Sequence, residues 1–393
     1  MSEKTISALA NQIRGVSYNK RDLHDKLDEN SIILLRANNI VEGKLNFRDV
    51  VYVDKSVVAA DQYLKDGDIL ISASSGSKKM IGKAASFHSK YKCTFGAFCK
   101  VVRPHDDIKE FLSIYFQSAA YRREISHLAL GANINNIRNE HINSLQVQVP
   151  DYVTRLQMIK VINKLQKIRD VKKQKLKKLD ELIKARFVEM FGDPANPINI
   201  WAPEKLEKIC ILNPKKEKKL ENDDLDVSFV PMSAVSEHGA IDTTKVKKYS
   251  EVKKGFTYFL ENDVLFAKIT PCMENGKGAV ATGLKNKKGF GSTEFHVLRP
   301  IKGKSNPYWL YTLTSFQSFR KLAELNMTGS AGQKRVPIKF LQNYKVVVPP
   351  ISLQNEFANF VQQVDKSKFE NIVYLNKTLS SKILSQIGDV IRD

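Results

Sequence analysis

The chain has 393 residues, enough for two or three domains with sizeable cores. Its 63 Lys and Arg exceed its 42 Asp and Glu by +21, which favours a polyanionic partner over a merely soluble basic protein. No run of 18 apolar residues occurs, so we expect no membrane span, and the first residues indicate no signal peptide. The four cysteines lack C-x-x-C spacing, which is typical of reduced thiols in a cytoplasmic protein.

The first 150 residues mix short apolar runs with turns. Apolar runs predict strands at residues 31–35, 68–72, 98–102 and 145–149. Residues 110–129 have the spacing of a helix, and residues 131–138 form a polar loop before the last strand. This part is therefore predicted to be a mixed α and β domain.

A long helix is predicted over residues 154–191, which contain neither Pro nor Gly. Its apolar side chains follow a seven-residue pattern through Met158, Ile162, Leu165, Leu176, Leu179, Ile183 and Met190. Arg169 and Lys172 interrupt the pattern, and we expect Ile168 and Val171 to continue the stripe there. Such a helix is roughly 57 Å long and can lie along one partner helix.

The second half has the same order of elements. Strands are predicted at residues 228–230, 263–267 and 295–298, and a helix at residues 307–325. A second long helix is predicted from residue 353 to about residue 387. Its apolar stripe consists of Phe357, Val361, Val364, Ile372, Leu375, Leu379, Ile383 and Ile387.

Sequence similarity between the halves indicates a duplication, with an offset of about 197 residues. The matched segments are 67–73 with 262–268, 101–104 with 297–300, 121–123 with 319–321, and 147–150 with 346–349. A duplication predicts pseudo-two-fold symmetry, which requires the two long helices to pair antiparallel; the alternative is that each helix packs on its own domain. The predicted fold class is α+β: two homologous mixed domains separated by an antiparallel coiled coil. A protein with this pseudo-two-fold symmetry is suited to binding duplex DNA, which is itself two-fold symmetric.

Catalytic motifs are missing from the sequence. Residues 76–84 approximate a phosphate-binding loop, but Ala84 replaces the Ser or Thr that would hold magnesium. There is no G-x-S-x-G or H-E-x-x-H motif, and no His and Cys at zinc spacing. We therefore expect no catalytic or metal site, although a self-contained nuclease or methyltransferase with degenerate motifs remains an alternative.

Two pairs of polar loops occupy corresponding places in the halves: residues 72–79 with 268–277, and 133–138 with 332–336. Lys, Ser, Thr and backbone amides suit phosphates, whereas Asn, Gln, Arg and Glu can read base edges. The alternative is that they are ordinary turns. Predicted DNA contacts in the first half are Ser74, Ser75, Ser77, Lys78, Lys79, Asn133, Asn135, Asn136 and Arg138. In the second half they are Lys268, Thr270, Glu274, Asn275, Lys277, Ser292, Thr293, Gln333, Lys334 and Arg335.

Within this set, two roles are predicted. Phosphate contacts are assigned to the lysines Lys78, Lys79, Lys277 and Lys334. Base reading is assigned to Asn135, Asn136, Arg138, Thr270, Glu274, Asn275, Gln333 and Arg335.

Several segments resemble type I restriction-modification specificity subunits. Residues 178–194 (KLDELIKARFVEMFGDP) resemble the central conserved region of that family. Residues 266–277, 290–300 and 329–336 resemble stretches of its target-recognition domains, and residues 348–354 resemble the entry to its conserved helices. The first copy departs most from the family pattern in its recognition loops and its helix entry.

The resemblance implies a division of labour. Target-recognition domains would span residues 1–152 and 193–350, and conserved spacer helices residues 153–192 and 351–393. Each domain would read one half of a bipartite DNA site, and the helices would set the gap and dock modification subunits. The chain itself would be non-catalytic and bind no cofactor: S-adenosylmethionine belongs to the modification subunits, and ATP and Mg to the restriction subunits. The remaining alternative is a stand-alone DNA-binding or scaffold protein.

Overall fold

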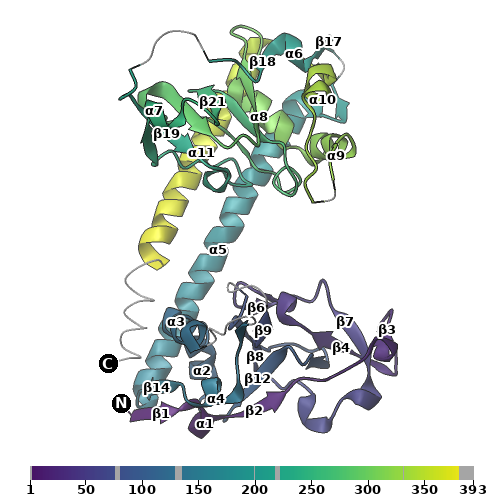
Figure 1. Cartoon of the computed structure of the whole chain (residues 1–393), viewed down its shortest axis with the longest axis vertical. Helices are drawn as coiled ribbons and strands as arrows, with labels where there is room; N and C mark the ends of the chain where they lie inside the picture. Colours follow the sequence, from purple (N-terminus) through teal and green to yellow (C-terminus); the bar gives the residue numbers. More distant parts are fainter. Residues whose placement is uncertain are drawn as a thin grey trace. The chain divides into compact units, whose positions relative to one another are not determined.

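The computed structural model describes residues 2–75, 80–128, 135–198, 200–216, 222–330 and 332–379. The chain divides into two compact units, which are described separately (Figure 1). Unit 1 comprises residues 1–171 with residues 373–393, and unit 2 comprises residues 172–372.

Unit 1 is built on two four-stranded sheets. The first has the order β10-β8-β12-β2, with β10 (Ala84–Ser86), β8 (Ile69–Ser72), β12 (Cys99–Pro104) and β2 (Ala10–Arg14). The second has the order β11-β4-β7-β3, with β11 (Cys93–Phe95), β4 (Ser31–Leu35), β7 (Val51–Asp54) and β3 (Leu23–His24). Every residue of β4 is buried, as its apolar run predicts.

Shorter elements complete unit 1. Paired strands are β1 (Ser2–Thr5) with β14 (Gln146–Val149), β5 (Ile40–Val41) with β6 (Lys44–Leu45), and β9 (Ser74–Ser75) with β13 (Asn135–Asn136). The helices are α1 (Ile6–Leu9), α2 (Lys109–Tyr115), α3 (Ala119–Leu128), α4 (Asn139–Asn143) and the first part of α5 (Tyr152–Phe191). The four strands and the long helix expected from the sequence are thereby confirmed.

Unit 2 repeats this plan. Its first sheet has the order β18-β25-β22-β23, with β18 (Cys210–Leu212), β25 (Phe295–Pro300), β22 (Val264–Ala267) and β23 (Gly278–Val280). Its second has the order β20-β19-β24-β21, with β20 (Val246–Lys248), β19 (Asp226–Val230), β24 (Lys288–Gly291) and β21 (Thr257–Leu260). Smaller pairs are β17 (Pro203–Lys205) with β26 (Lys345–Val347), and β15 (Gly192–Asp193) with β16 (Asn196–Pro197).

Apart from α7 (Tyr249–Val252), the helices of unit 2 follow the same order as those of unit 1. They are α6 (Leu206–Ile209), α8 (Pro307–Ser315), α9 (Gln317–Leu325), α10 (Ile338–Asn343) and α11 (Ile351–Leu379), which is joined by the last part of α5. In both units the first sheets have corresponding strand orders, and the second sheets contain one parallel pair, β4 with β11 and β19 with β24. The predicted duplication is confirmed as a shared fold.

The segments predicted to be helical at residues 110–129 and 307–325 are helical, but each forms two helices, so the prediction of one continuous helix was wrong. In unit 2 the break falls at Phe316, whose extended backbone lets its ring pack 5.0 Å from the ring of Phe187. In unit 1 it falls after Tyr115, where the rings of Phe116 and Tyr121 lie 4.8 Å apart in the core. A buried aromatic side chain therefore occupies the break in each unit; residue 129 lies outside the described part.

An ion pair with a buried carboxylate recurs at the same place in both units. Arg103 donates two hydrogen bonds to the carboxylate of Asp68, at 2.8 and 2.7 Å. Arg299 does the same to Asp263, also at 2.8 and 2.7 Å. These residues belong to the repeated sequence segments, so the segments by which the duplication is recognised stabilise the first sheet of each unit.

Within unit 2, α5 and α11 lie side by side and run antiparallel (Figure 1). Arg186 pairs with Glu356 at 2.9 Å, and Asp180 pairs with Lys368 at 2.8 Å, so residue numbers rise along one helix as they fall along the other. The antiparallel pairing is confirmed over this part of the helices. Of the α11 stripe, Phe357, Val361 and Val364 are buried; Ile372, Leu375 and Leu379 lie where side chains are not described, and Ile383 and Ile387 lie outside the described residues.

Residues of the predicted α5 stripe are buried or half-buried, with one exception in its middle. Val171 is 56% exposed, whereas Arg169 and Lys172 are half-buried. Ile168 is half-buried, so the expected shift holds there and was wrong at Val171, and the seven-residue pattern continues through the two basic residues. Long basic side chains can cover apolar surface with their stems while the charged ends stay in water.

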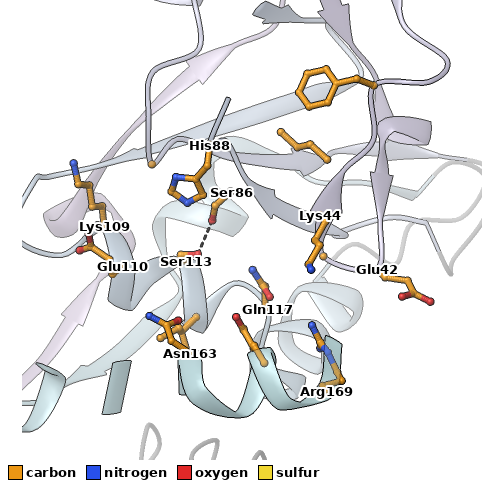
Figure 2. Close-up of a pocket in the computed structure, with 16 residues that line it drawn as sticks. Glu42, Lys44, Ser86, His88, Lys109, Glu110, Ser113, Gln117, Asn163 and Arg169 are labelled. Atoms are coloured by element: carbon orange, nitrogen blue, oxygen red, sulfur yellow. Dashed lines mark hydrogen bonds between the residues drawn. The ribbon is translucent and has the colours of Figure 1, made fainter. Parts of the chain in front are cut away.

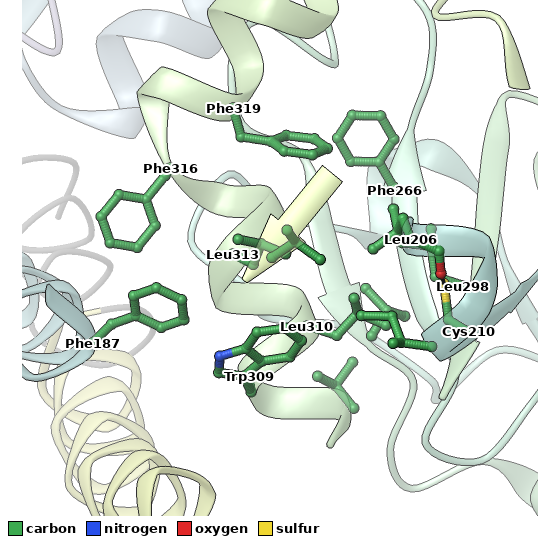
Figure 3. Packing of buried hydrophobic residues seen from close by; sticks show 14 of the residues in the cluster. Phe187, Leu206, Cys210, Phe266, Leu298, Trp309, Leu310, Leu313, Phe316 and Phe319 are labelled. Atoms are coloured by element: carbon green, nitrogen blue, oxygen red, sulfur yellow. Dashed lines mark hydrogen bonds between the residues drawn. The ribbon is translucent and has the colours of Figure 1, made fainter. Parts of the chain in front are cut away.

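The largest core of unit 2 gathers aromatic residues from α5, α8, α9 and α11 (Figure 3). Phe187 points from α5 toward Trp309 and Phe316, and Phe319 lies against Phe266 of β22 with ring centroids 5.8 Å apart. The core therefore joins the helix pair to the sheet on which the candidate site is built.

Candidate nucleic-acid interface

In each unit, the two predicted polar loops are joined by backbone hydrogen bonds. In unit 1, β9 pairs with β13 so that Ser74 lies opposite Asn136, and the amide of Ile137 donates to Ala73 at 2.8 Å. In unit 2, the amide of Val336 donates to Lys268 at 2.9 Å, next to an Ile269–Arg335 bridge. The two units thus join their polar loops by corresponding backbone hydrogen bonds but carry different side chains there. We call this shared backbone arrangement the loop frame.

The predicted residues of unit 1 are described only in part. Ser74 is half-buried, and Asn136 and Arg138 are exposed. The backbones of Ser75 and Asn135 are placed but not their side chains. Ser77, Lys78, Lys79 and Asn133 lie outside the described residues.

Two basic residues near this frame were missed by the sequence reasoning. Arg14 and Lys100 face each other across β2 and β12, and Lys100 donates to Asn139, next to Arg138. Burial lowers the pKa of Lys100, and the neighbouring charge of Arg14 adds to the effect. Two strands far apart in the sequence bring these cations together, so no local pattern could have indicated the cluster.

In unit 2, an ion pair connects two turns of the frame. Arg335 donates to both carboxylate oxygens of Glu294, at distances of 2.8 to 3.2 Å. This bonding lowers the pKa of Glu294 and raises that of Arg335. The side chains remain 25% and 42% exposed, so both can still meet a ligand. Glu294 was not predicted, although its neighbours Ser292 and Thr293 were.

The other predicted residues of unit 2 differ in exposure. The exposed ones are Glu274, Asn275, Thr293, Gln333 and Lys334, and the half-buried ones are Lys268, Thr270, Lys277 and Ser292. Thr270 is hydrogen-bonded to Glu274 at 3.0 Å. Lys277 donates to the carbonyl of Met232 at 3.2 Å, which indicates that it supports the loop.

A buried arginine supports the 270–277 loop from behind. Arg320 is 6% exposed, and it donates to the carbonyls of Met273 and Gly276. Burial lowers its pKa to about 10, so the guanidinium remains charged at neutral pH. In unit 1, Arg122 donates likewise to the carbonyl of Ile81. The arginine repeated in the two halves therefore donates to backbone carbonyls in each unit.

His296 fixes the other loop of unit 2. Its Nε2 lies 2.8 Å from the carbonyl of Val336, and its Nδ1 lies 3.0 Å from the side-chain nitrogen Nδ2 of Asn213. A neutral ring with hydrogen on Nε2 satisfies both contacts, because it donates to the carbonyl and accepts from the amide. Burial lowers the pKa of His296 from 6.5.

We expect this histidine to make unit 2 sensitive to acid. Because the folded pKa lies below 6.5, the unfolded chain binds protons more readily below that pH, and stability falls as the pH drops from 7 toward 5.5. His296→Gln keeps a donor and an acceptor but does not titrate. The loss of stability between the two pH values, measured by urea denaturation, should be smaller in this variant. Equal losses in both proteins would contradict the expectation.

A polar cleft of about 460 Å³ in unit 1 is less suited to DNA (Figure 2). Its basic side chains have acidic partners: Lys44 pairs with Asp170 at 2.6 Å, and Nδ1 of His88 lies 2.8 Å from Asp66. On the cleft wall, Ser86 and Ser113 are hydrogen-bonded to each other at 2.6 Å. These pairings leave little net charge for a phosphate.

The described residues offer no metal site, and their buried thiols are unreactive. They contain no group of three or more His, Cys, Asp or Glu arranged to hold a metal ion. Burial raises the pKa values of the Cys93, Cys99 and Cys210 thiols to about 12, so these thiols stay protonated and unreactive. Over the same part of the chain, every helix is too short or too polar to cross a bilayer.

A family model, the type I restriction modification DNA specificity domain, matches residues 3–181 and 200–380. The chain belongs to this family. The two matches fall on the two halves of the duplication, and the family resemblance identified from the sequence is confirmed.

Curated relatives and a solved structure agree with the family assignment. The chain is 39% identical over 204 residues to the EcoEI specificity subunit of Escherichia coli, which is 51% of this chain but only 32% of that protein. It is 27% identical over 384 residues to the EcoKI specificity subunit of Escherichia coli K12, covering 91% of this chain and 81% of that one. The S subunit crystal structure from M. genitalium has the same fold, with a TM-score of 0.50 at 14% identity over 99% of this chain and 94% of that one.

Proposed function

We propose that this protein is the non-catalytic DNA specificity subunit of a type I restriction-modification complex, in which each unit reads one half of a bipartite site. The repeated loop frame carries the proposal. Ser74 and Asn136 occupy it in unit 1, and Ile269 and Arg335 in unit 2. A common backbone with different side chains suits two readers of different half-sites.

Charge supports DNA as the ligand. The chain has a formal net charge of +21. Arg14, Lys100 and Arg138 lie near the frame of unit 1, and the exposed Lys334 belongs to that of unit 2. Phosphate contacts from such side chains supply affinity without sequence preference, whereas exposed Asn, Gln and Glu side chains can add preference.

The long helices are proposed to set the gap between half-sites and to dock modification subunits. α5 has 40 residues, a length of about 60 Å. The proposed domains remain residues 1–152 and 193–350, with spacer helices at 153–192 and 351–393. S-adenosylmethionine chemistry would belong to the modification subunits, and ATP and Mg to the restriction subunits. A protein that reads the cell's DNA in this way would work in the cytoplasm.

The test is a selection for bound DNA. The full chain, co-purified with its modification subunits, is mixed with random-sequence duplexes, and the bound fraction is sequenced. We expect a motif of two short half-sites separated by unspecified bases. A continuous motif, or no motif, would contradict the proposal, and so would methylation or cleavage of DNA by the purified chain alone.

Two neighbouring variants separate positioning from reading in the same assay. Lys334→Ala should weaken binding to all sequences alike and reduce the salt slope by about 1. Gln333→Ala should relax one position of one half-site, because an amide can make paired hydrogen bonds to a base edge. Both side chains are exposed, so folding should be unaffected. If neither variant changes binding, this loop does not contact DNA.

A further inference from the structure

Phe98 of unit 1 presents an apolar ring to solvent from a tightly held turn. The residue is 73% exposed and lies between β11 and β12. Its carbonyl accepts the amides of Ala73 and Ser74, at 3.0 and 3.1 Å, and the preceding amide of Ala97 donates to Val16 at 3.0 Å. The backbone therefore holds the ring beside the β9–β13 loop frame at the cost of leaving apolar surface in water.

A cleft of about 500 Å³ opens beside this ring. Its lining includes Tyr18, Arg36, Asn38 and Ser74. Asp49 steadies the two polar residues at this cleft: Asn38 donates to its carboxylate at 2.6 Å, and Arg36 lies 3.6 Å from it. Aromatic and hydrogen-bonding groups thus share one open cleft, which we call the Phe98 cleft.

The corresponding position in unit 2 has opposite chemistry. The amide of Lys268 donates to the carbonyl of Glu294 at 2.9 Å, as the amide of Ala73 donates to that of Phe98. By this hydrogen bond, Phe98 and Glu294 are equivalent, and Glu294 is bound to Arg335. An exposed aromatic ring in one unit and an ion pair in the other, on the same frame, is the kind of change that alters which base is preferred.

We propose that the Phe98 cleft binds a nucleobase of the half-site read by unit 1. The ring of Phe98 makes the apolar contact, and Arg36 and Asn38 lie where hydrogen bonds to a base edge can form. This inference rests on the proposed function, since it assumes that unit 1 faces DNA. A nucleobase fits because a phenyl ring packs well against a thymine methyl or a base face, and Arg and Asn match the acceptors and donors of base edges.

Three variants test the cleft in the complex with modification subunits. Phe98→Ala should weaken binding to the selected site roughly 5- to 100-fold, the range expected for losing one base–aromatic contact. It should relax one position of the unit 1 half-site and leave the other half-site and the salt slope unchanged. The loss of affinity in Phe98→Leu should be smaller than in Phe98→Ala. Tyr91→Ala is the matched control, because Tyr91 is also an exposed aromatic residue of unit 1, 61% exposed, but it contacts Phe47 outside the cleft.

Modified duplexes distinguish a contact of the ring with a thymine methyl group from stacking of the ring on a base face. Uracil in place of thymine removes the methyl group, and 2-aminopurine reports loss of base stacking by its fluorescence. A Phe98-dependent effect in either duplex supports the inference. If the wild-type complex selects a bipartite motif and Phe98→Ala selects the same motif with the same affinity, the inference is wrong and the proposed function stands. If the wild-type complex selects no motif, the proposed function itself fails.

Discussion

Replacing Phe187 by alanine should lower the free energy of unfolding by about 3–5 kcal/mol, the usual effect of removing a buried aromatic ring. The side chain is 2% exposed. Its ring centroid lies 5.0 Å from that of Phe191, 5.0 Å from Phe316, 5.4 Å from Phe357 and 6.5 Å from Trp309. Packing around the ring brings together α5, α8 and α11, so a cavity there would remove contacts from all three helices.

Chemical denaturation followed by helix circular dichroism measures this effect, with Val188→Ala as the control. Val188 is the next residue of the same helix and is 41% exposed, so its truncation should change stability by less than about 1 kcal/mol. Phe187→Leu should have an intermediate effect because it fills part of the cavity. A loss below about 1 kcal/mol in Phe187→Ala would mean that the helices are not packed around this ring.

Local patterns sufficed to predict the long helix and several strands. The run at residues 31–35 became the fully buried β4, and the Pro-free and Gly-free segment became α5. Both signals are contained in adjacent residues: a continuous apolar run for a buried strand, and a seven-residue spacing for a helix with one buried face.

Tertiary packing determined the helix breaks and the burial of Arg169, which local sequence patterns did not predict. The breaks before α3 and α9 have no Gly or Pro, and they form where Phe116 and Phe316 enter their cores. Likewise, Arg169 stays on the buried stripe of α5, which a pattern of apolar residues alone could not indicate. Burial of a side chain against a distant element is not encoded in its immediate neighbours.

The candidate site shows the same division. Comparing the two halves indicated which loops correspond, and the structure joins those loops by backbone hydrogen bonds in each unit. The comparison of the two halves did not indicate Phe98, Glu294 or the Arg14–Lys100 pair. Each of these depends on neighbours that lie on another strand or turn. Internal comparison therefore located the frame, and geometry was needed to find side chains around it.

The Arg–Asp ion pairs in the repeated segments are expected to affect stability more than DNA recognition. We expect Arg299→Ala to cost about 3–5 kcal/mol, because it leaves the carboxylate of Asp263 buried without its cation. That carboxylate is 2% exposed, and it also accepts a hydrogen bond from the backbone amide of Leu260 at 2.7 Å. Arg103→Ala should have the same effect in unit 1, where Asp68 has the equivalent environment.

Hydrogen exchange of the sheet amides localises the effect to one unit at a time. Arg299→Ala should speed exchange in β22 and β25, and Arg103→Ala in β8 and β12, each without changing the other unit. Arg21→Ala is the control, because that side chain is 85% exposed and lies 3.8 Å from Asp22. Restoring neutrality with the Asp263→Asn, Arg299→Ala double variant should recover part of the loss. Complexes that remain folded should select the same DNA motif as wild type, since this pair holds the sheet under the loops; an altered motif would place Arg299 at the DNA instead.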